Sequence, residues 1–221
     1  MGQIINRVTG EVVGNIGGNE VLGKPFLCVY GSRKPRNCPE DIIERPLADG
    51  LTAYIRFETS EALNKVINDG DKNASNVQGT IIGRKPMLDL LGLTEDELFE
   101  QADKNTVADV PTLDAVLKKM SGLVSAEPLP IQMHVAYTTR GIYGAGVIAK
   151  PMFLDLLYAG LGSFYVLPSS IHEVIITPRV SGETDKQMNE MVDAVNKTVL
   201  EPNDVLADTA FYFDSEGLHK A

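Results

Sequence analysis

The short links between successive strand-like segments constrain the fold of this chain more than any other feature. Residues 131–137 and 143–149 are strand-like and separated by only a few residues, and so are residues 164–167 and 173–177. Parallel neighbours need a crossover of about a dozen residues or more, whereas antiparallel neighbours can be joined by a tight turn. The sheet should therefore be largely antiparallel and, with packed helices beside it, the expected fold class is α+β.

Local signals predict further strands and helices. Thr94 and Glu97 have the spacing of a capping box, and Pro151 stands where proline commonly opens a helix. The further expected strands cover residues 4–8, 11–16, 25–30, 52–57, 80–83 and 209–213, the first two as a hairpin around Thr9 and Gly10. The expected helices begin after Thr59 or Ser60, at Thr94, after Pro111 and at Pro151, and a last helix carries Met188, Met191, Val192, Val195 and Val199 on one face. Residues 31–50 are expected to form a loop.

A polar, turn-rich stretch at residues 68–76 suggests where the chain divides. Its 221 residues allow one large domain or a medium domain with a small companion. We place the boundary after residue 75, which gives a small β-rich N-terminal unit (residues 1–75) and an α+β domain (residues 76–221). The first part has 9 Lys and Arg against 10 Asp and Glu, and the second has 11 against 20, so the second part carries most of the net charge of −10.

The acidic charge and the hydropathy pattern exclude several classes of protein. A net charge of −10 disfavours binding to a phosphate backbone, so we expect no nucleic-acid partner. No stretch approaches the roughly 18 apolar residues of a membrane span, and residues 1–5 lack the basic start and long apolar run of a signal peptide. These features indicate a cytoplasmic protein that does not bind a membrane.

The sequence indicates neither a metal site nor a cofactor. Cys28 and Cys38 have no third cysteine or close histidine beside them, so we expect free thiols. His134 lies in an apolar strand and His219 in the polar tail, and neither has the spacing of a metal ligand. Residues 144–149 match Gly-x-Gly-x-x-Ala, but these glycines lie inside a strand-like run and no helix opens on them, which argues against a dinucleotide site.

One short segment groups a hydroxyl, an imidazole and a carboxylate. Its weak catalytic candidates are Ser169, Ser170 and His172. On an extended strand Ser170 and His172 share a face, whereas Glu173 points the other way and cannot orient the imidazole. The competing interpretation is a structural turn after Pro168, in which the serines satisfy backbone groups.

Completion of a catalytic triad would need a carboxylate from elsewhere in the chain. Asp155 and Asp208 are the distant carboxylates considered for that role. The segment also lacks the Gly-x-Ser-x-Gly pattern of a nucleophile elbow, which favours the structural interpretation.

A small basic cluster supplies weak binding candidates. It consists of Tyr30, Arg33, Lys34 and Arg36 in the proline-containing loop. These side chains could meet an acidic partner or a phosphate, although three exposed charges in a loop are commonly only solvated.

Two runs in the second part carry a family resemblance. The first extends from Thr80 to Arg84, from Leu88 to Phe99 and from Ala102 to Thr106, and the second from Tyr143 to Gly146 and from Phe164 to Ile175, with the core Leu-Pro-Ser-Ser-x-His-Glu-Val. Together they resemble, over about residues 79–215, a large bacterial family catalogued only as a domain of unknown function. The resemblance implies a bacterial cytoplasmic protein but no activity, cofactor or catalytic residue. Residues 1–75 depart from the family pattern.

The expected function is binding rather than catalysis. The incomplete catalytic set and the divergent N-terminal part favour a non-enzymatic binding or regulatory protein, with another protein as partner and residues 1–75 as the recognition element. The alternative is a serine-dependent hydrolase or transferase that uses Ser170 and His172. A third hypothesis is a small-ligand sensor that uses a pocket beside residues 144–149. The sequence leaves the oligomeric state open.

Overall fold

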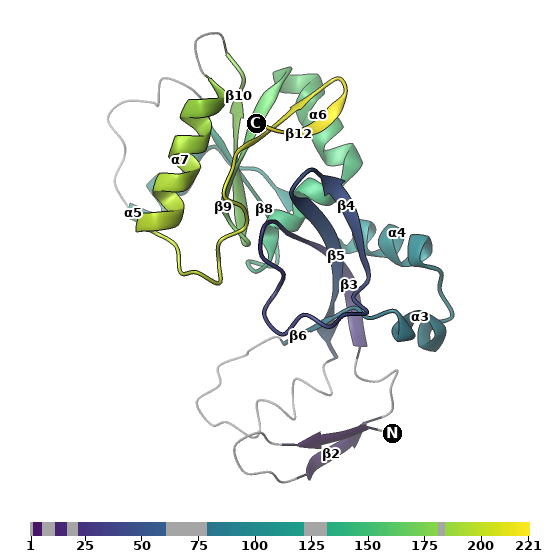
Figure 1. Cartoon of the computed structure of the whole chain (residues 1–221). Helices are drawn as coiled ribbons and strands as arrows, with labels where there is room; N and C mark the ends of the chain where they lie inside the picture. The colour runs from purple at the N-terminus through teal and green to yellow at the C-terminus, as the bar shows by residue number, and fades with distance from the viewer. Residues whose placement is uncertain (1, 6–11, 17–21, 61–78, 122–131, 181–183) are drawn as a thin grey trace. The chain divides into compact units, whose positions relative to one another are not determined.

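The computed structural model describes residues 2–5, 12–16, 22–60, 79–121, 132–180 and 184–221 (Figure 1). The chain splits into two compact units, each assembled from stretches that are separate in the sequence. Unit 1 comprises Met1–Phe26, Pro39–Ile43 and Ile55–Asn105, and unit 2 comprises Leu27–Cys38, Glu44–Tyr54 and Thr106–Ala221. The predicted linker at residues 68–76, and with it the boundary after residue 75, lies outside the described residues.

Helices and antiparallel strands together give an α+β fold, as the sequence predicts. The strands are β1 (Gly2–Ile5), β2 (Val12–Ile16), β3 (Leu22–Tyr30), β4 (Glu44–Ala48), β5 (Leu51–Thr59), β6 (Thr80–Ile82), β7 (Ala108–Asp109), β8 (His134–Thr138), β9 (Phe164–Ser170), β10 (Glu173–Pro178), β11 (Phe211–Asp214) and β12 (Gly217–Lys220). The helices are α3 (Pro86–Leu91), α4 (Glu95–Asn105), α5 (Leu113–Ser121), α6 (Pro151–Leu161) and α7 (Asp185–Thr198), with a 3₁₀ helix η1 (Gly144–Ala149).

Unit 1 contains the predicted N-terminal strand pair and helices α3 and α4. Strands β1 and β2 are antiparallel, as expected, while the turn between them lies outside the described residues. Thr94 forms the predicted capping box, because its Oγ1 accepts from the Glu97 amide at 3.3 Å and the Glu97 carboxylate accepts from the Thr94 amide at 2.8 Å. The helix α4 that follows buries Leu98, Phe99 and Ala102. The helix expected after Thr59 or Ser60 falls on residues that are not described.

Unit 2 is built on a six-stranded sheet with the order β12-β11-β9-β10-β8-β7. All neighbouring pairs in this sheet are antiparallel. Helices α5 and α7 lie on one face, and α6 lies on the other with η1 (Figure 1). The buried cluster of Tyr165, Leu167, Met188, Val192 and Ala210 joins α7 to the sheet. Two faces of one sheet are thus covered by different elements.

The structure corrects the prediction of a strand at residues 143–149. These residues form the 3₁₀ helix η1 after Tyr143, which has a left-handed φ of 52°. A Cβ on Gly144 would lie 2.1 Å from the His172 carbonyl oxygen, and a Cβ on Gly146 would lie 2.1 Å from the Leu27 carbonyl oxygen. Only glycine therefore permits this close approach of one backbone to another.

Other elements also differ from the predictions. Residues 31–50 are not all loop, because β4 lies within them and pairs with the first half of β5. Helix α3 opens on Pro86 and ends at Gly92, whose φ is 65°. Strand β12 follows β11 through a tight turn at residues 215–216. Segments of four to six residues such as these are too short to show the hydrophobic periodicity on which sequence-based assignment depends.

Candidate functional site

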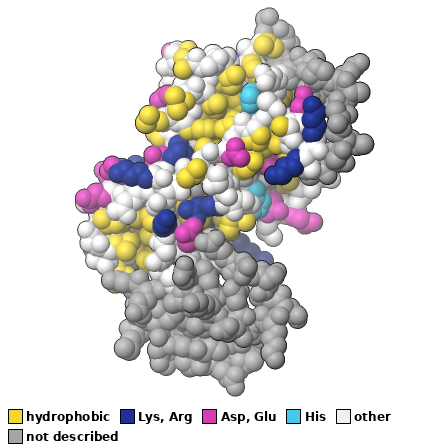
Figure 2. Space-filling model, turned by 180° about the vertical axis from the view of Figure 1, so that it is seen from behind, with side chains coloured by type: hydrophobic (Ala, Val, Ile, Leu, Met, Phe, Trp, Pro, Cys, Tyr) yellow, Lys and Arg dark blue, Asp and Glu magenta, His cyan; other side chains and the backbone are white. Residues whose placement is uncertain are grey.

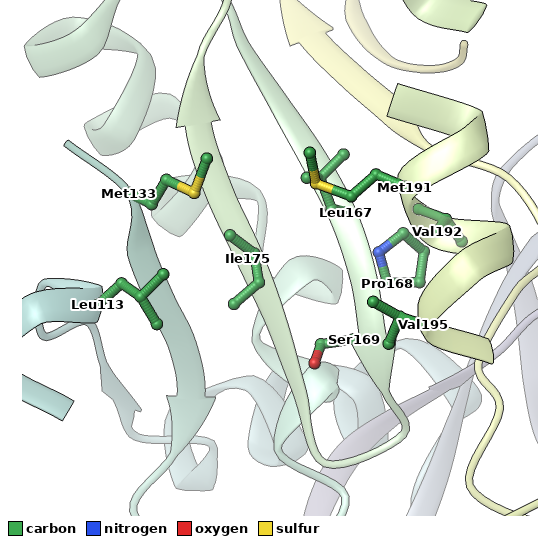
Figure 3. A pocket seen from close by; sticks show the side chains of 9 residues that line it. All are labelled: Leu113, Met133, Leu167, Pro168, Ser169, Ile175, Met191, Val192 and Val195. Carbon is green, nitrogen blue, oxygen red and sulfur yellow. The ribbon is translucent and has the colours of Figure 1, made fainter. Parts of the chain in front are cut away.

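An apolar cleft of about 160 Å³ lies on the face of the sheet that carries α5 and α7 (Figure 3). Side chains from the sheet form its floor, and the two helices form its walls. The lining residues are Leu113, Met133, Leu167, Pro168, Ser169, Ile175, Met191, Val192 and Val195. Ser169 alone among them contributes a hydroxyl. We call this feature the apolar cleft.

The spacing of residues along each element explains why the cleft exists. Successive strand residues point to opposite faces, so Leu167 and Ser169 share the face of Ile175. Helix α7 packs over β9 through Val192, while α5 approaches from the other side through Leu113. Ile175 lies between the two helices and is only half-buried (Figure 3). The gap between the helices therefore remains open above this side chain.

The rim of the apolar cleft continues into exposed apolar side chains on both helices. On α7, Met191 is 42 % exposed and Val199, at the C-cap, is 73 % exposed. They stand four residues before and after Val195, on the same side of the helix. On α5, Leu117 is 47 % exposed and follows Leu113 by one turn. Exposed apolar side chains gathered beside an apolar cleft are typical of an interaction site.

Exposed apolar side chains also occur on α6, on the other face of the sheet. Met152 is 73 % exposed and Leu156 is 68 % exposed. Figure 2, which shows the molecule from behind, has apolar side chains gathered over the upper part of the view, with charged side chains scattered among them. Met152 and Leu156 do not line the apolar cleft, so α6 offers a useful control surface.

A row of polar side chains crosses the sheet at the Ser169 end of the cleft. Ser169 Oγ donates to Glu173 Oε1 at 3.3 Å, and the Tyr137 hydroxyl donates to Asp109 Oδ2 at 3.1 Å. Burial raises the pKa of Tyr137, and its hydrogen bond to Asp109 and the charges of Asp109 and Glu173 raise it further. Both carboxylates therefore lie close to the same hydroxyl. We call Asp109, Tyr137, Ser169 and Glu173 the polar row.

The predicted catalytic residues form a different arrangement from a nucleophile and its base. Ser170 is 7 % exposed, and its Oγ accepts from the His172 amide at 3.0 Å. The His172 ring accepts at Nδ1 from the Tyr143 amide, at 3.1 Å. Over the described stretches, no hydrogen bond joins the hydroxyl of Ser169 or Ser170 to this ring.

The structure also brings a carboxylate to His172 that the sequence did not single out. Asp204 Oδ1 lies 3.7 Å from His172 Nε2. Of the two carboxylates considered beforehand, Asp208 accepts from Ser32 Oγ at 2.8 Å and Asp155 is exposed on α6. Asp204 follows α7 in an irregular segment, so no local pattern in the sequence could have paired it with His172.

These contacts determine which proton transfers the imidazole can perform. A base that activates serine needs a free nitrogen lone pair facing the hydroxyl. Here the Nδ1 lone pair accepts a hydrogen bond from the Tyr143 amide. The neutral ring therefore carries its proton on Nε2, next to Asp204. The arrangement links the β9–β10 turn to η1 through side-chain and backbone hydrogen bonds.

The basic cluster is largely engaged with neighbours in unit 2. The Tyr30 hydroxyl donates to Glu44 at 2.6 Å, and Lys34 Nζ lies 3.1 Å from the same carboxylate. Arg33 donates to the Pro202 carbonyl at 3.4 Å. Burial raises the pKa of Tyr30, and its hydrogen bond to Glu44 raises it further. Glu44 thus neutralises part of the charge that would attract an acidic partner.

The cysteines and the acidic side chains show no metal chemistry in the described stretches. Cys28 is buried and Cys38 partly buried, and no disulfide joins them. Among the residues that the structure describes, no three His, Cys, Asp or Glu side chains come together as metal ligands. None of the described helices is long and apolar enough to cross a membrane.

Comparison with known proteins identifies a family. A family model described as a family of unknown function (DUF5688) matches residues 67–215. No curated protein and no solved structure matches the sequence. The matched range contains all the residues of the apolar cleft and of the polar row.

Proposed function

This chain belongs to the family of unknown function whose model matches residues 67–215, as its resemblance predicted, and we propose that it is a non-enzymatic binding or regulatory protein. The observation that supports the proposal best is the apolar cleft between α5 and α7. We propose that the cleft receives one bulky apolar side chain from a protein partner.

The volume of the cleft suits a group of that size. An apolar cavity of roughly 150 Å³ stays dry and accepts benzene, because water would find too few hydrogen-bond partners there. The cleft measures about 160 Å³ and offers water little besides the Ser169 hydroxyl. The side chain of leucine, methionine or phenylalanine has the volume and polarity to fill it.

The exposed rim favours a polypeptide over a small molecule. A ligand that only filled the cleft would leave Leu117 and Val199 in water, at 47 % and 73 % exposure. A peptide segment laid between α5 and α7 would cover the rim and insert one anchor between the helices, as helical peptides do in apolar grooves. Interfaces commonly draw most of their affinity from such an anchor.

The contacts of His172 support binding over catalysis. Its Nδ1 accepts a hydrogen bond from the Tyr143 amide and so cannot act as a base for Ser170. One observation favours the alternative of a serine hydrolase or transferase: Asp204 stands 3.7 Å from Nε2. Labelling of Ser170 by a fluorophosphonate probe would support that alternative, and we expect none.

Site-specific photo-crosslinking tests the proposed function. p-Benzoylphenylalanine is placed at Leu117 on the rim, or at Met152 on α6 as the matched control, in the full-length chain in the cells that encode it. We expect one adduct of defined mass from position 117, none of that mass from position 152, and its loss when Ile175→Phe or Val195→Phe fills the cleft. The same adduct from both positions, or its persistence in both filled variants, would contradict the proposal.

The prediction that residues 1–75 form the recognition element stays a separate prediction. Its candidates Tyr30, Arg33, Lys34 and Arg36 lie outside the cleft lining. Substitution of Arg36, an exposed member of this cluster, by glutamate should leave the adduct at position 117 unchanged if the cleft is the binding site.

A further inference from the structure

We infer that the group bound in the apolar cleft carries a positive charge beside its apolar part, an inference that rests on the proposed function. In a protein partner, this means a bulky apolar anchor with a lysine or arginine next to it. The inference comes from the polar row, which ends the cleft on one side only.

The polar row places a negative charge next to the cleft, separated from it only by the Ser169 hydroxyl. Ser169 lines the cleft, and its Oγ donates to Glu173 Oε1 at 3.3 Å. Asp109 is the cross-strand neighbour of Tyr137 and accepts a hydrogen bond from the Tyr137 hydroxyl at 3.1 Å. Glu173, on β10, is the carboxylate next to Ser169, and its charge also acts on the Tyr137 hydroxyl that donates to Asp109 on β7.

The described neighbours do not balance this charge. In the part of the chain that the structure describes, the salt bridges include no Lys or Arg paired with Glu173 or Asp109. The acidic side chains on the outward face of α7, in contrast, have partners at i, i+4: Lys186 with Glu190 and Lys197 with Asp193. In the described stretches, Glu173 and Asp109 therefore lack the cationic partners that these α7 carboxylates have.

Charge complementarity then selects the sign of the ligand. A carboxylate beside an apolar surface loses part of its hydration, and an approaching cation restores a favourable partner. An anion at the same place would meet repulsion from Glu173. The cleft thus favours an apolar group with a cationic substituent one or two bonds away and disfavours the same group with an anion.

Three small probes that share one ring separate charge from shape. Benzylammonium, benzyl alcohol and phenylacetate are titrated into the full-length chain with ¹³C-labelled methyl groups, and shifts at Leu113, Ile175 and Val195 are followed by NMR. A partly exposed ion pair contributes about 0.2–1 kcal/mol, so we expect benzylammonium to bind up to about 5-fold more tightly than benzyl alcohol, with phenylacetate the weakest.

Variants identify the source of the preference. Glu173→Gln should remove most of the preference for benzylammonium and leave binding of benzyl alcohol unchanged. Glu190→Gln, an exposed acidic position on α7, is the matched control and should keep the preference. The preference should also shrink as salt is raised, since partly exposed charges are screened.

The outcomes distinguish this inference from the proposed function. Equal binding of the three probes, or a preference that survives both Glu173→Gln and Asp109→Asn, would overturn the inference while the cleft remains a binding site. Absence of saturable shifts with every probe would overturn the proposed function as well. Shifts that persist in Ile175→Phe and in Val195→Phe would show that the probes bind elsewhere, which overturns both.

Discussion

The two faces of the six-stranded sheet in unit 2 are closed in different ways. On the face of η1 and α6, backbone meets backbone: Gly146 sits where an added Cβ would be 2.1 Å from the Leu27 carbonyl oxygen, and Val147 and Ile148 are at most 1 % exposed. On the face of α5 and α7, side chains alone fill the space, and the cleft above Ile175 remains. We call the first the packed face and the second the open face.

The difference shows how one sheet can have a closely packed face and, on its other face, a candidate binding site. Interiors are packed to nearly the density of organic crystals, so an unfilled apolar space forfeits van der Waals contacts that the chain could make. The packed face makes those contacts with elements of its own chain. The open face leaves them for a ligand, in keeping with the proposed function.

The largest expected effect comes from disturbing the packed face. Gly146→Val would drive a branched side chain into the backbone of Leu27, so we expect a loss of about 3 kcal/mol or more in the free energy of unfolding, or failure to fold. Gly160→Ala on α6 is the control, because a Cβ there meets nothing within 4 Å. It should stabilise the chain by about 0.5–1 kcal/mol. Urea denaturation followed by circular dichroism measures both, and equal effects would contradict the account of the packed face.

Adjacent residues on β10 allow the sharpest comparison of the two faces. Ile175 faces the cleft, and Ile176, which is fully buried, faces the other way. Enlarging Ile176 to phenylalanine should cost about 1–3 kcal/mol of unfolding free energy, because no space receives the ring. Ile175→Phe should change it by less than about 1 kcal/mol, because the ring enters the cleft. If Ile175→Phe proved as costly as Ile176→Phe, the open face would be as tightly packed as its opposite.

The residues of β9 give an effect of intermediate size. Ser170→Ala removes the buried acceptor of the His172 amide and should cost about 1 kcal/mol in thermal or urea unfolding. Ser169→Ala, on the face of the cleft, removes a partly exposed hydrogen bond to Glu173 and should cost less than about 0.5 kcal/mol. A larger cost at Ser169 than at Ser170 would reverse the roles that we assign to these two hydroxyls.

The smallest expected effect is on the pH dependence of stability. Burial raises the pKa of Tyr165, on the open face, and its hydrogen bond to Asp185 raises it further. The folded chain therefore holds this proton to higher pH than the unfolded chain does, so stability is complete below a pH of about 10 and falls as the pH rises through the folded pKa. Tyr165→Phe should flatten this alkaline limb in urea titrations at several pH values. An unchanged slope would mean that other groups cause the alkaline loss, such as Tyr30, whose pKa is also raised.

The sequence predicts the secondary-structure elements better than the tertiary contacts between them. The antiparallel order, the capping box at Thr94 and the helix at Pro151 follow from local signals, and all are present. The sequence predicts a strand at residues 143–149, because apolar residues interrupted by glycine fit a strand or a 3₁₀ helix equally well locally. Their 3₁₀ form depends on contact with the distant backbone of Leu27, which no local pattern records.

The candidate site illustrates the same limit. The segment around His172 was found because its residues are adjacent in the sequence, but its carboxylate neighbour Asp204 comes from beyond α7. The cleft draws Leu113, Ile175 and Val195 from three separate elements. Each of them alone looks like an ordinary core residue, so only their arrangement in space reveals the gap between the helices.

Methyl NMR under xenon pressure tests the central claim most directly, because xenon enters apolar cavities without any polar contact. In the full-length chain, the account predicts saturable shifts at the methyl groups of Leu113, Ile175 and Val195 and none at Val147 or Ile148. In Ile175→Phe, it predicts loss of the shifts at Leu113 and Val195. Equal shifts on both faces of the sheet, or no saturable shift at the cleft, would contradict it.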